Sequence, residues 1–430
     1  MLDTWFSSAL WPFATWGWPD ETPDLACFYP TNVLSTAREI IFLWVARMIM
    51  MGLEFVDDVP FRDVYIHSVV QAPDGRRMSK SLGTGIDPIE LIDKYGADAT
   101  RFGLLLMSSI QDVRFSEEKI EMGRNFANKL WNASRLVLLA AAAGEDDPDG
   151  AGGAMVPPER SDAHVVDRWI TARLASAIEE TKAALDGYGF AAAVDRLYHF
   201  VWDEFCDWYL EMVKVRLYGD DEAGRRAAAG HARWVLERVV GLLHPLLPFV
   251  TEEIADLYGG APLLAGTYPQ VAAPATAVAD AAAVGALQGA VEALRRYRAD
   301  RRVSPGDVLR VAVSADDDAY ASLYRERAPE VRALARTELS LEDPAGGDVV
   351  IVPGATFTVA VAAADPDAER ARLQAMLQKL AAEVGRAETK LANARFVDRA
   401  PADVVQKERH KLAAYRADHD EVAARLAELG

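Results

Sequence analysis

The chain has 430 residues, a formal net charge of −19, 51% hydrophobic residues and 26% charged residues. This length is too great for a single hydrophobic core, so we expect several domains. The acidic balance excludes a protein whose whole surface binds nucleic acid, although it is compatible with a local basic groove.

Two cysteines, Cys27 and Cys206, lie far apart and have no neighbours at metal-ligand spacing. We therefore expect no disulfide framework and no protein-bound metal, and a reducing cytoplasm fits this composition. The N-terminus "MLDTWFSSALWPF" lacks the basic region of a signal peptide. The most apolar run, residues 40–53, is too short to span a bilayer and predicts a buried helix, so we expect no membrane.

Residues 1 to about 110 predict an α/β arrangement. The β-like run "VYIHSVV" (residues 64–70) precedes the basic, glycine-bearing run "RRMSKSLGTG", and a helix is expected from about Pro88. Open α/β sheets bind ligands at the carboxyl ends of their strands. Gly83 and Gly85 let the backbone come close to a ligand, and Lys80 is suited to neutralise a phosphate. The alternative is an ordinary solvated turn with an exposed lysine.

The pattern from about residue 117 to 257 is helical throughout. Four segments carry apolar residues at three- and four-residue spacing, which predicts an antiparallel helical bundle. The runs 144–162 and 218–230 between them are loop-like. The aromatic residues of 200–214 are expected mostly in the bundle core.

The stretch 259–283 is rich in Pro, Gly and Ala and predicts a surface linker. A helix over 287–302 and strands within 307–315 and 348–363 suggest a small α/β region. In the last 65 residues two heptad patterns flank a proline-containing bend, which predicts an antiparallel coiled-coil hairpin. Residues 366–430 carry 12 Lys/Arg and 11 Asp/Glu, so this arm is the least acidic region and a plausible place to meet a polyanion.

The run RMSKS resembles the KMSKS signature of class I aminoacyl-tRNA synthetases, with Arg77 in place of the first lysine. Its surroundings resemble the valyl-tRNA synthetase family in particular, in the right order along the whole chain. The segments that carry this resemblance are "LDTWFSSALWPFATWGWP" (2–19), "EIIFLWVARMIMMG" (39–52), "NKLWNASR" (128–135), "LHPLLPFVTEEI" (243–254) and "KLANARFVDRAPADVVQKERHKL" (390–412). The DTWFSS and terminal-hairpin elements favour the valyl enzymes over their isoleucyl and leucyl relatives.

The resemblance implies a multidomain fold that joins α/β and all-α parts. It places a partial Rossmann-type catalytic domain at 1–115, a helical anticodon-binding domain at 116–260, a linker with a small α/β region at 261–365, and a coiled-coil tRNA-binding arm at 366–430. It also implies the activity: valine is activated by ATP, with Mg²⁺ accompanying the nucleotide, and the valyl group is then transferred to tRNA(Val).

The same resemblance implies roles for single residues. Lys80 is the catalytic charge that stabilises the triphosphate, and the other residues expected at ATP are Met78, Ser79, Ser81, His67 and Glu39. A satisfied histidine at a strand end is the alternative for His67. Glu39 and Ala37 stand where relatives carry aspartate and glycine, and Ser68 and Thr84 where they often carry glycine and asparagine.

A slot for valine must be small, apolar and rigid, since one methylene contributes only about 1–3 kcal/mol of discrimination. Ile40 and Trp44 are four residues apart and so share a helix face, and the resemblance adds Trp5 to them. The alternative is that all three are core residues. In the arm, the candidate phosphate contacts are Arg386, Lys390, Arg395, Arg399, Lys407 and Lys411, and the alternative for each is an ordinary solvated charge.

Class I synthetases also use a HIGH motif, and no H-x-G-H run occurs in this sequence. We therefore expect the chain to begin in mid-enzyme, after the HIGH segment and the editing domain, and to need a complementing N-terminal half. Two other functions stay open: a non-catalytic tRNA-binding module, and a coiled-coil interaction protein. The last leaves DTWFSS and RMSKS unexplained.

Overall fold

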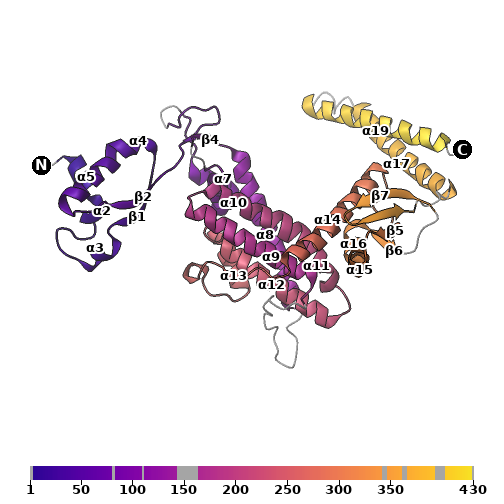
Figure 1. Cartoon of the computed structure of the whole chain (residues 1–430). Helices are drawn as coiled ribbons and strands as arrows, with labels where there is room; N and C mark the ends of the chain where they lie inside the picture. Colours follow the sequence, from indigo (N-terminus) through magenta and orange to yellow (C-terminus); the bar gives the residue numbers. More distant parts are fainter. Residues whose placement is uncertain are drawn as a thin grey trace. The chain divides into compact units, whose positions relative to one another are not determined.

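The first 114 residues form two parallel strand–helix–strand units (Figure 1). In the first unit β1 (Thr31–Thr36) pairs with β2 (Phe61–Ile66), and in the second β3 (Val70–Gln71) pairs with β4 (Val113–Arg114). The computed structural model describes residues 3–79, 83–108, 111–142, 163–340, 346–360, 366–392 and 402–428. Contacts along the chain divide it into two compact parts: one holds residues 1–292 and 329–335, and the other holds 293–328 and 336–430.

Short helices surround the first strand pair. They are α1 (Thr4–Ala9), α2 (Trp11–Ala14), α3 (Pro23–Phe28), α4 (Arg38–Ile40), η1 (Ile41–Val45) and α5 (Ala46–Phe55). Together α4, η1 and α5 form the predicted apolar helix, but its middle is a π-turn, in which the Ala46 amide donates to the Ile41 carbonyl. The prediction that this helix is buried was wrong. Val45 and Met48 are buried, whereas Phe42 is 81% exposed and Met50 66% exposed, because the described chain packs on only one face of the helix.

The predicted strand over 64–70 is in fact two strands. β2 ends at Ile66 and β3 begins at Val70, and the residues between them pass from one strand pair to the other. The second pair is connected through α6 (Pro88–Tyr95) and α7 (Ala97–Leu106), so a helix does begin at Pro88 as predicted. The basic run therefore follows the carboxyl end of β3, the predicted position relative to a strand.

The predicted helical bundle is confirmed. It consists of α8 (Glu117–Ala142), α9 (Val165–Asp186), α10 (Phe190–His199), η2 (Phe200–Tyr209), α11 (Leu210–Leu217), α12 (Glu222–Leu243) and α13 (Pro248–Leu257). Phe200, Phe205 and Tyr209 are fully buried, as expected for the aromatic segment. The loop expected over 218–230 was wrong from residue 222 onward, where alanines and arginines begin α12 because both are strong helix formers.

A short helix, η3 (Leu263–Ala265), precedes α14 (Ala277–Asp300), which starts ten residues before the predicted helix. Within the described residues, α14 is the one helix long and apolar enough to cross a membrane, but its residues Val284, Leu287 and Val291 are buried within the protein. The expected small α/β region is a four-stranded sheet in the order β6-β5-β8-β7. Its elements are β5 (Leu309–Ala315), α15 (Asp318–Glu326), α16 (Ala328–Ala335), β6 (Thr337–Ser340), β7 (Asp348–Val352) and β8 (Ala355–Val359).

The sequence pattern did not predict β6, which pairs in parallel with β5. On the covered face of the sheet the Tyr324 ring packs edge-on against Phe357, and the Tyr324 hydroxyl donates to the Pro353 carbonyl at 2.6 Å. The chain ends in α17 (Pro366–Ala392) and α19 (Ala402–Glu428), which pack against each other along their length and confirm the predicted helical hairpin. The predicted bend lies largely outside the described residues.

A buried ionic cluster organises the bundle core. The Arg216 guanidinium donates to both carboxylate oxygens of Asp167, at 2.8 and 2.5 Å, and the Tyr209 hydroxyl donates to Asp167 at 3.2 Å. Burial alone would raise the pKa of Asp167, but the charge and hydrogen bonds of Arg216 outweigh it and hold that pKa below its usual value. Beside this cluster, the His231 Nε2 atom lies 3.2 Å from the Thr171 hydroxyl. Burial lowers the pKa of His231, so the neutral ring is favoured.

We predict that His231 makes the protein sensitive to mild acid. The pKa of His231 is lower in the folded state than in the unfolded state, where it is about 6.5. The neutral ring therefore stabilises the fold above about pH 6.5, and this contribution is lost as the pH falls below that value. Urea unfolding at pH 7.5 and pH 5.0 should show a smaller loss of stability in His231→Gln than in the wild type. The exposed His410→Gln is the control and should keep the wild-type dependence. An unchanged pH dependence in His231→Gln would contradict the assignment.

Candidate functional site

The RMSKS run leaves the sheet through a narrow backbone hairpin. Arg77 forms an antiparallel bridge with Gln71, and the Ala72 amide donates to the Arg76 carbonyl at 2.9 Å. The Asp74 carboxylate accepts from the Arg76 amide at 3.0 Å and from its guanidinium at 2.7 Å. Arg76 therefore has its charge paired locally with Asp74.

Thr84 binds the backbone of the first part of the RMSKS run, at Arg77 and Ser79. Its hydroxyl accepts from the Ser79 amide at 3.0 Å and donates to the Arg77 carbonyl at 3.1 Å, while its own amide donates to the Ser79 carbonyl at 3.2 Å. Gly83 next to it has a φ of 64°, which a glycine adopts without strain. Lys80 and Ser81, the predicted centre of the site, lie outside the described residues. We call the three Thr84 bonds the Thr84 clasp.

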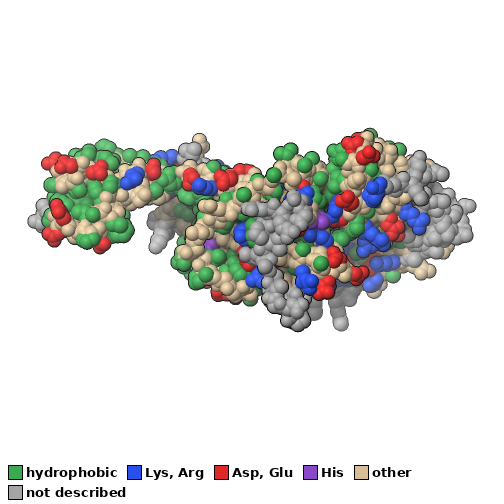
Figure 2. All heavy atoms as spheres, turned by 60° about the horizontal axis from the view of Figure 1, so that its bottom comes forward, with side chains coloured by type: hydrophobic (Ala, Val, Ile, Leu, Met, Phe, Trp, Pro, Cys, Tyr) green, Lys and Arg blue, Asp and Glu red, His purple; other side chains and the backbone are tan. Residues whose placement is uncertain are grey.

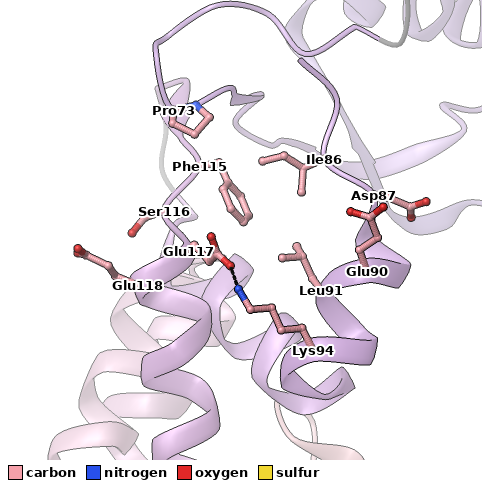
Figure 3. A pocket seen from close by; sticks show the side chains of 10 residues that line it. All are labelled: Pro73, Ile86, Asp87, Glu90, Leu91, Lys94, Phe115, Ser116, Glu117 and Glu118. Atoms are coloured by element: carbon pink, nitrogen blue, oxygen red, sulfur yellow. Dashed lines mark hydrogen bonds and ion pairs between the residues drawn. The ribbon is translucent and has the colours of Figure 1, made fainter. Parts of the chain in front are cut away.

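An apolar cluster anchors the run from below. Met78, the second residue of RMSKS, packs with Ile86 against buried Met107, Phe115 and Ile120. Figure 3 shows the side chains of Ile86, Phe115 and Leu91 pointing toward one another. Met78 is thus a hydrophobic anchor in this structure, and its predicted place at ATP stays a prediction.

A cavity of about 640 Å³ opens beside this cluster (Figure 3). Lys94 on its wall donates to Glu117 at 2.6 Å, and this hydrogen bond raises the pKa of Lys94 and lowers that of Glu117. The other charged residues that line it are all acidic: Asp87, Glu90 and Glu118. Such a rim repels phosphate, so this cavity is not where a triphosphate would bind.

Two predicted ATP residues lie at the carboxyl ends of the first strand pair. His67 directly follows β2, its amide donates to the Thr36 carbonyl at 3.0 Å, and its ring is exposed. Glu39 lies in the first turn after β1 and is also exposed, 3.8 Å from the Arg38 guanidinium. The structure therefore brings both residues to one sheet edge, where open α/β sheets bind ligands.

The predicted valine residues are only partly brought together. Ile40 and Trp44 pack against the same small core of Leu34, Val45, Met48 and Phe61. The Trp44 ring nitrogen donates to the Ser8 carbonyl at 2.9 Å, and its ring lies 5.7 Å from that of Trp11. Trp5 instead lies under the Arg47 guanidinium, at 4.9 Å, and lines a neighbouring cavity of about 520 Å³.

The sequence did not predict that Trp11 and Ser8 contact Trp44. Both belong to the aromatic N-terminal segment, but helical spacing does not say which of its rings meets Trp44. The π-turn between Ile41 and Val45 adds one residue to the helical turn, and that change of phase has no sequence signature here.

The arm residues divide by their partners. Lys390 donates across the hairpin to Glu408 at 3.0 Å, and Arg386 donates to Glu383 on its own helix at 2.8 Å. Lys411 is exposed. Arg395 and Arg399 lie outside the described residues, as does the Lys407 side chain. Among the residues that the structure describes, no group of three or more His, Cys, Asp and Glu is placed to hold a metal ion.

Comparison with known proteins gives three family matches in chain order. Residues 1–116 match class I tRNA synthetases of the I, L, M and V group, residues 167–313 match the anticodon-binding domain of tRNA ligases, and residues 365–430 match the valyl-tRNA synthetase tRNA-binding arm. The valine–tRNA ligases of Geobacter sulfurreducens and Bacillus subtilis are each 41% identical to this chain over 100% of its length. The predicted resemblance to the valyl-tRNA synthetases is confirmed.

The chain spans about half the length of the curated relatives that it matches, 49% in both of these enzymes. Among solved structures, a LeuRS of Agrobacterium radiobacter K84, in a ternary complex with tRNA and LeuAMS, aligns with a TM-score of 0.50 and 18% identity. That alignment covers 84% of this chain and 42% of the LeuRS. It supports the fold alone.

We predict that removing the Thr84 hydroxyl loosens the base of the signature run. Thr84→Val keeps the side-chain shape but loses both hydroxyl hydrogen bonds, each contributing about 1 kcal/mol. The Ser79 amide should then exchange its hydrogen about fivefold faster, as measured by hydrogen exchange. Thr84→Ser keeps the hydroxyl and should exchange like the wild type. Equal rates in all three proteins would show that the Thr84 clasp does not hold in solution.

Proposed function

We propose that this chain supplies the signature-loop part, the anticodon-binding bundle and the tRNA arm of a valine–tRNA ligase. The reaction joins the carboxylate of valine to the α-phosphate of ATP and releases pyrophosphate. The valyl group then passes to a ribose hydroxyl of tRNA(Val), and AMP leaves. One observation carries the proposal: the match to valine–tRNA ligases over the whole chain includes a clasped RMSKS run at the carboxyl end of a parallel strand.

In this proposal the two N-terminal strand–helix–strand units are the second half of a Rossmann-type catalytic domain. Lys80 offsets the charge that builds on the leaving pyrophosphate, and Ser79 and Ser81 hold the loop around it. His67 and Glu39 approach the nucleotide from the edge of the first strand pair. Mg²⁺ comes with the ATP, and its chemistry is to screen the triphosphate oxygens. The reaction belongs in the cytoplasm.

The exposed apolar surface of the N-terminal region supports the proposal that a complementing N-terminal half of the enzyme binds there. Phe42 and Met50 are largely exposed on the long helix, and Val33 and Val64 are exposed on the two strands. Figure 2 shows hydrophobic side chains spread over this region, at the left of the view. Exposed apolar surface of this kind marks an interface, and a sheet with so few strands leaves unpaired edges. We therefore propose that an N-terminal segment of the same enzyme type covers it.

The arm supports tRNA as the partner through its charge distribution. Residues 385–411, around the bend, carry seven Lys/Arg and four Asp/Glu, whereas the rest of 366–430 carries five Lys/Arg and seven Asp/Glu. The end near the bend is therefore the positive end, and it includes Arg386, Lys390, Arg395, Arg399, Lys407 and Lys411. Phosphate contacts of this kind position a nucleic acid without reading its bases.

A second candidate function is a tRNA-binding module without catalysis. The bundle and the arm favour it, because they match the anticodon-binding domain of tRNA ligases and the valyl-tRNA synthetase tRNA-binding arm. An isoleucyl relative is disfavoured, since the arm match is to the valyl enzymes.

Lys80→Ala separates these two functions. With an N-terminal half from a matched relative added in trans, the wild type should catalyse valine-dependent pyrophosphate exchange. The variant should lose at least about a hundredfold of that activity, because a charge at the leaving group is removed. Its tRNA affinity, measured by gel shift at fixed salt, should stay within about twofold, and deletion of 366–430 should weaken it strongly. Exchange without the added half, or tRNA binding that ignores the arm, would contradict the proposal.

Phe42 tests the complementing surface. Phe42→Ser removes an exposed ring that contributes little to the isolated chain, so we expect an unchanged melting temperature and less self-association in sedimentation. Association with the added N-terminal half should weaken about tenfold or more, because buried aromatic anchors dominate interfaces. The matched control is Leu139→Ser, an apolar residue 67% exposed on the bundle helix α8. If both variants bind the added half equally, Phe42 lies outside the interface.

A further inference from the structure

A cleft of about 660 Å³ lies in the first compact part of the chain, away from the RMSKS run. Its walls come from β2, from Ser108, which is the second residue after α7, and from the turn between α9 and α10 together with the start of α10. Neither the sequence motifs nor the proposed reaction gives this cleft a role. Its volume is within the range of ordinary ligand sites.

Three aromatic rings form its apolar walls. The Tyr65 ring lies 5.4 Å from that of Tyr188 at an angle of 31°, and 5.4 Å from that of Phe190 at 86°. All three side chains are only half-buried, so part of each ring faces solvent. The cleft thus has a corner built of flat apolar faces, the shape against which a planar ring stacks.

Polar groups stand at the two ends of this corner. The Tyr188 hydroxyl donates to the Asp63 carboxylate at 3.1 Å, and the Tyr65 hydroxyl lies 3.2 Å from that of Ser108. Tyr188 is held in place by a left-handed backbone, φ 58°, between Gly187 and Gly189. Asp63 is exposed and keeps acceptor capacity beyond its bond to Tyr188.

Among the described residues the lining contains neither Lys nor Arg, and its one charged group there is the Asp63 carboxylate. A phosphate is therefore excluded from the interior, whereas a neutral planar group with N–H donors is favoured. Among the ligand classes that meet a tRNA-handling protein, an unpaired nucleobase fits this description. Unpaired bases are recognised by stacking on aromatic side chains and by hydrogen bonds along their edges.

We propose that this cleft, the Tyr65 cleft, binds one unstacked nucleobase of the bound tRNA. The base stacks on the Tyr65 and Tyr188 rings, and Asp63 accepts a hydrogen bond from its exocyclic amine. Its sugar and phosphates stay outside, away from the carboxylate. This assignment rests on the proposed function, since it needs a tRNA on the protein.

The test measures tRNA(Val) binding by the full chain in filter binding at one fixed salt concentration. Stacking on one base corresponds to about a 5- to 100-fold change in Kd, so Tyr65→Leu should raise Kd by that factor. Tyr65→Phe keeps the ring and should stay within about twofold of the wild type. Tyr188→Leu gives a second variant for the case in which Tyr65→Leu fails to fold, and far-UV circular dichroism checks both.

A second measurement separates stacking from a purely structural role. The fluorescence of 2-aminopurine, placed singly in the unpaired acceptor end of the tRNA, should be quenched by the wild type and by Tyr65→Phe but not by Tyr65→Leu. Competition by free AMP or CMP at millimolar concentration would show a mononucleotide site of the same chemistry, and its absence would show a site for tRNA. Unchanged Kd and quenching in both leucine variants would overturn the Tyr65 cleft. If the wild type itself does not bind tRNA(Val), the proposed function fails as well.

Discussion

One turn of α7 holds the N-terminal region to the helical bundle, and the geometry around the signature run depends on it. The buried Asp98 carboxylate accepts from the amides of Phe249 and Val250, at 3.2 and 2.7 Å, where α13 begins. One turn later the Arg101 guanidinium donates to the carbonyls of Pro245 and Leu246, at 2.9 and 3.3 Å, just beyond the end of α12. The acid thus binds the first-turn amides of α13 and complements that helix dipole, while the base binds two carbonyls of the turn between α12 and α13.

The same helix is packed closely on its other side. A side chain at Gly103 would meet Ile120 at 2.5 Å, and one at Gly123 would meet the Ala99 carbonyl at 2.8 Å, so α7 and α8 touch through their glycines. From the Thr84 clasp the chain passes through α6 directly into α7. The base of the signature run is therefore connected to the bundle through short helices that are fixed at both ends, and a tRNA held by the bundle would act on a site with a defined position.

The sequence predicted the features that are repeated locally. Apolar spacing found the bundle and the hairpin, and the motif placed the RMSKS run after a strand. The sequence could not predict contacts between distant residues. Asp98 lies 151 residues from Phe249, and no pattern in either segment indicates that the two are bonded. The prediction that the helix around Phe42 is buried was wrong for the same reason. Its apolar spacing is the same whether or not another chain segment covers the helix. Spacing correctly joined Ile40 and Trp44, whereas Trp5, which the resemblance had added to them, lies in α1 under the Arg47 guanidinium.

Within the first compact part, the helical bundle and the N-terminal region differ in how completely their own residues bury apolar side chains and pair charges. In the bundle the buried Asp167–Arg216 pair is also bonded to Tyr209, whose ring is fully buried. In the N-terminal region the core consists of small groups of residues, while Phe42 and Met50 face solvent. Regions with few buried contacts open at low free energy, and those with a complete core open only with global unfolding. We therefore expect the part that carries the predicted chemistry to open at a lower free energy than the bundle that we expect to hold tRNA.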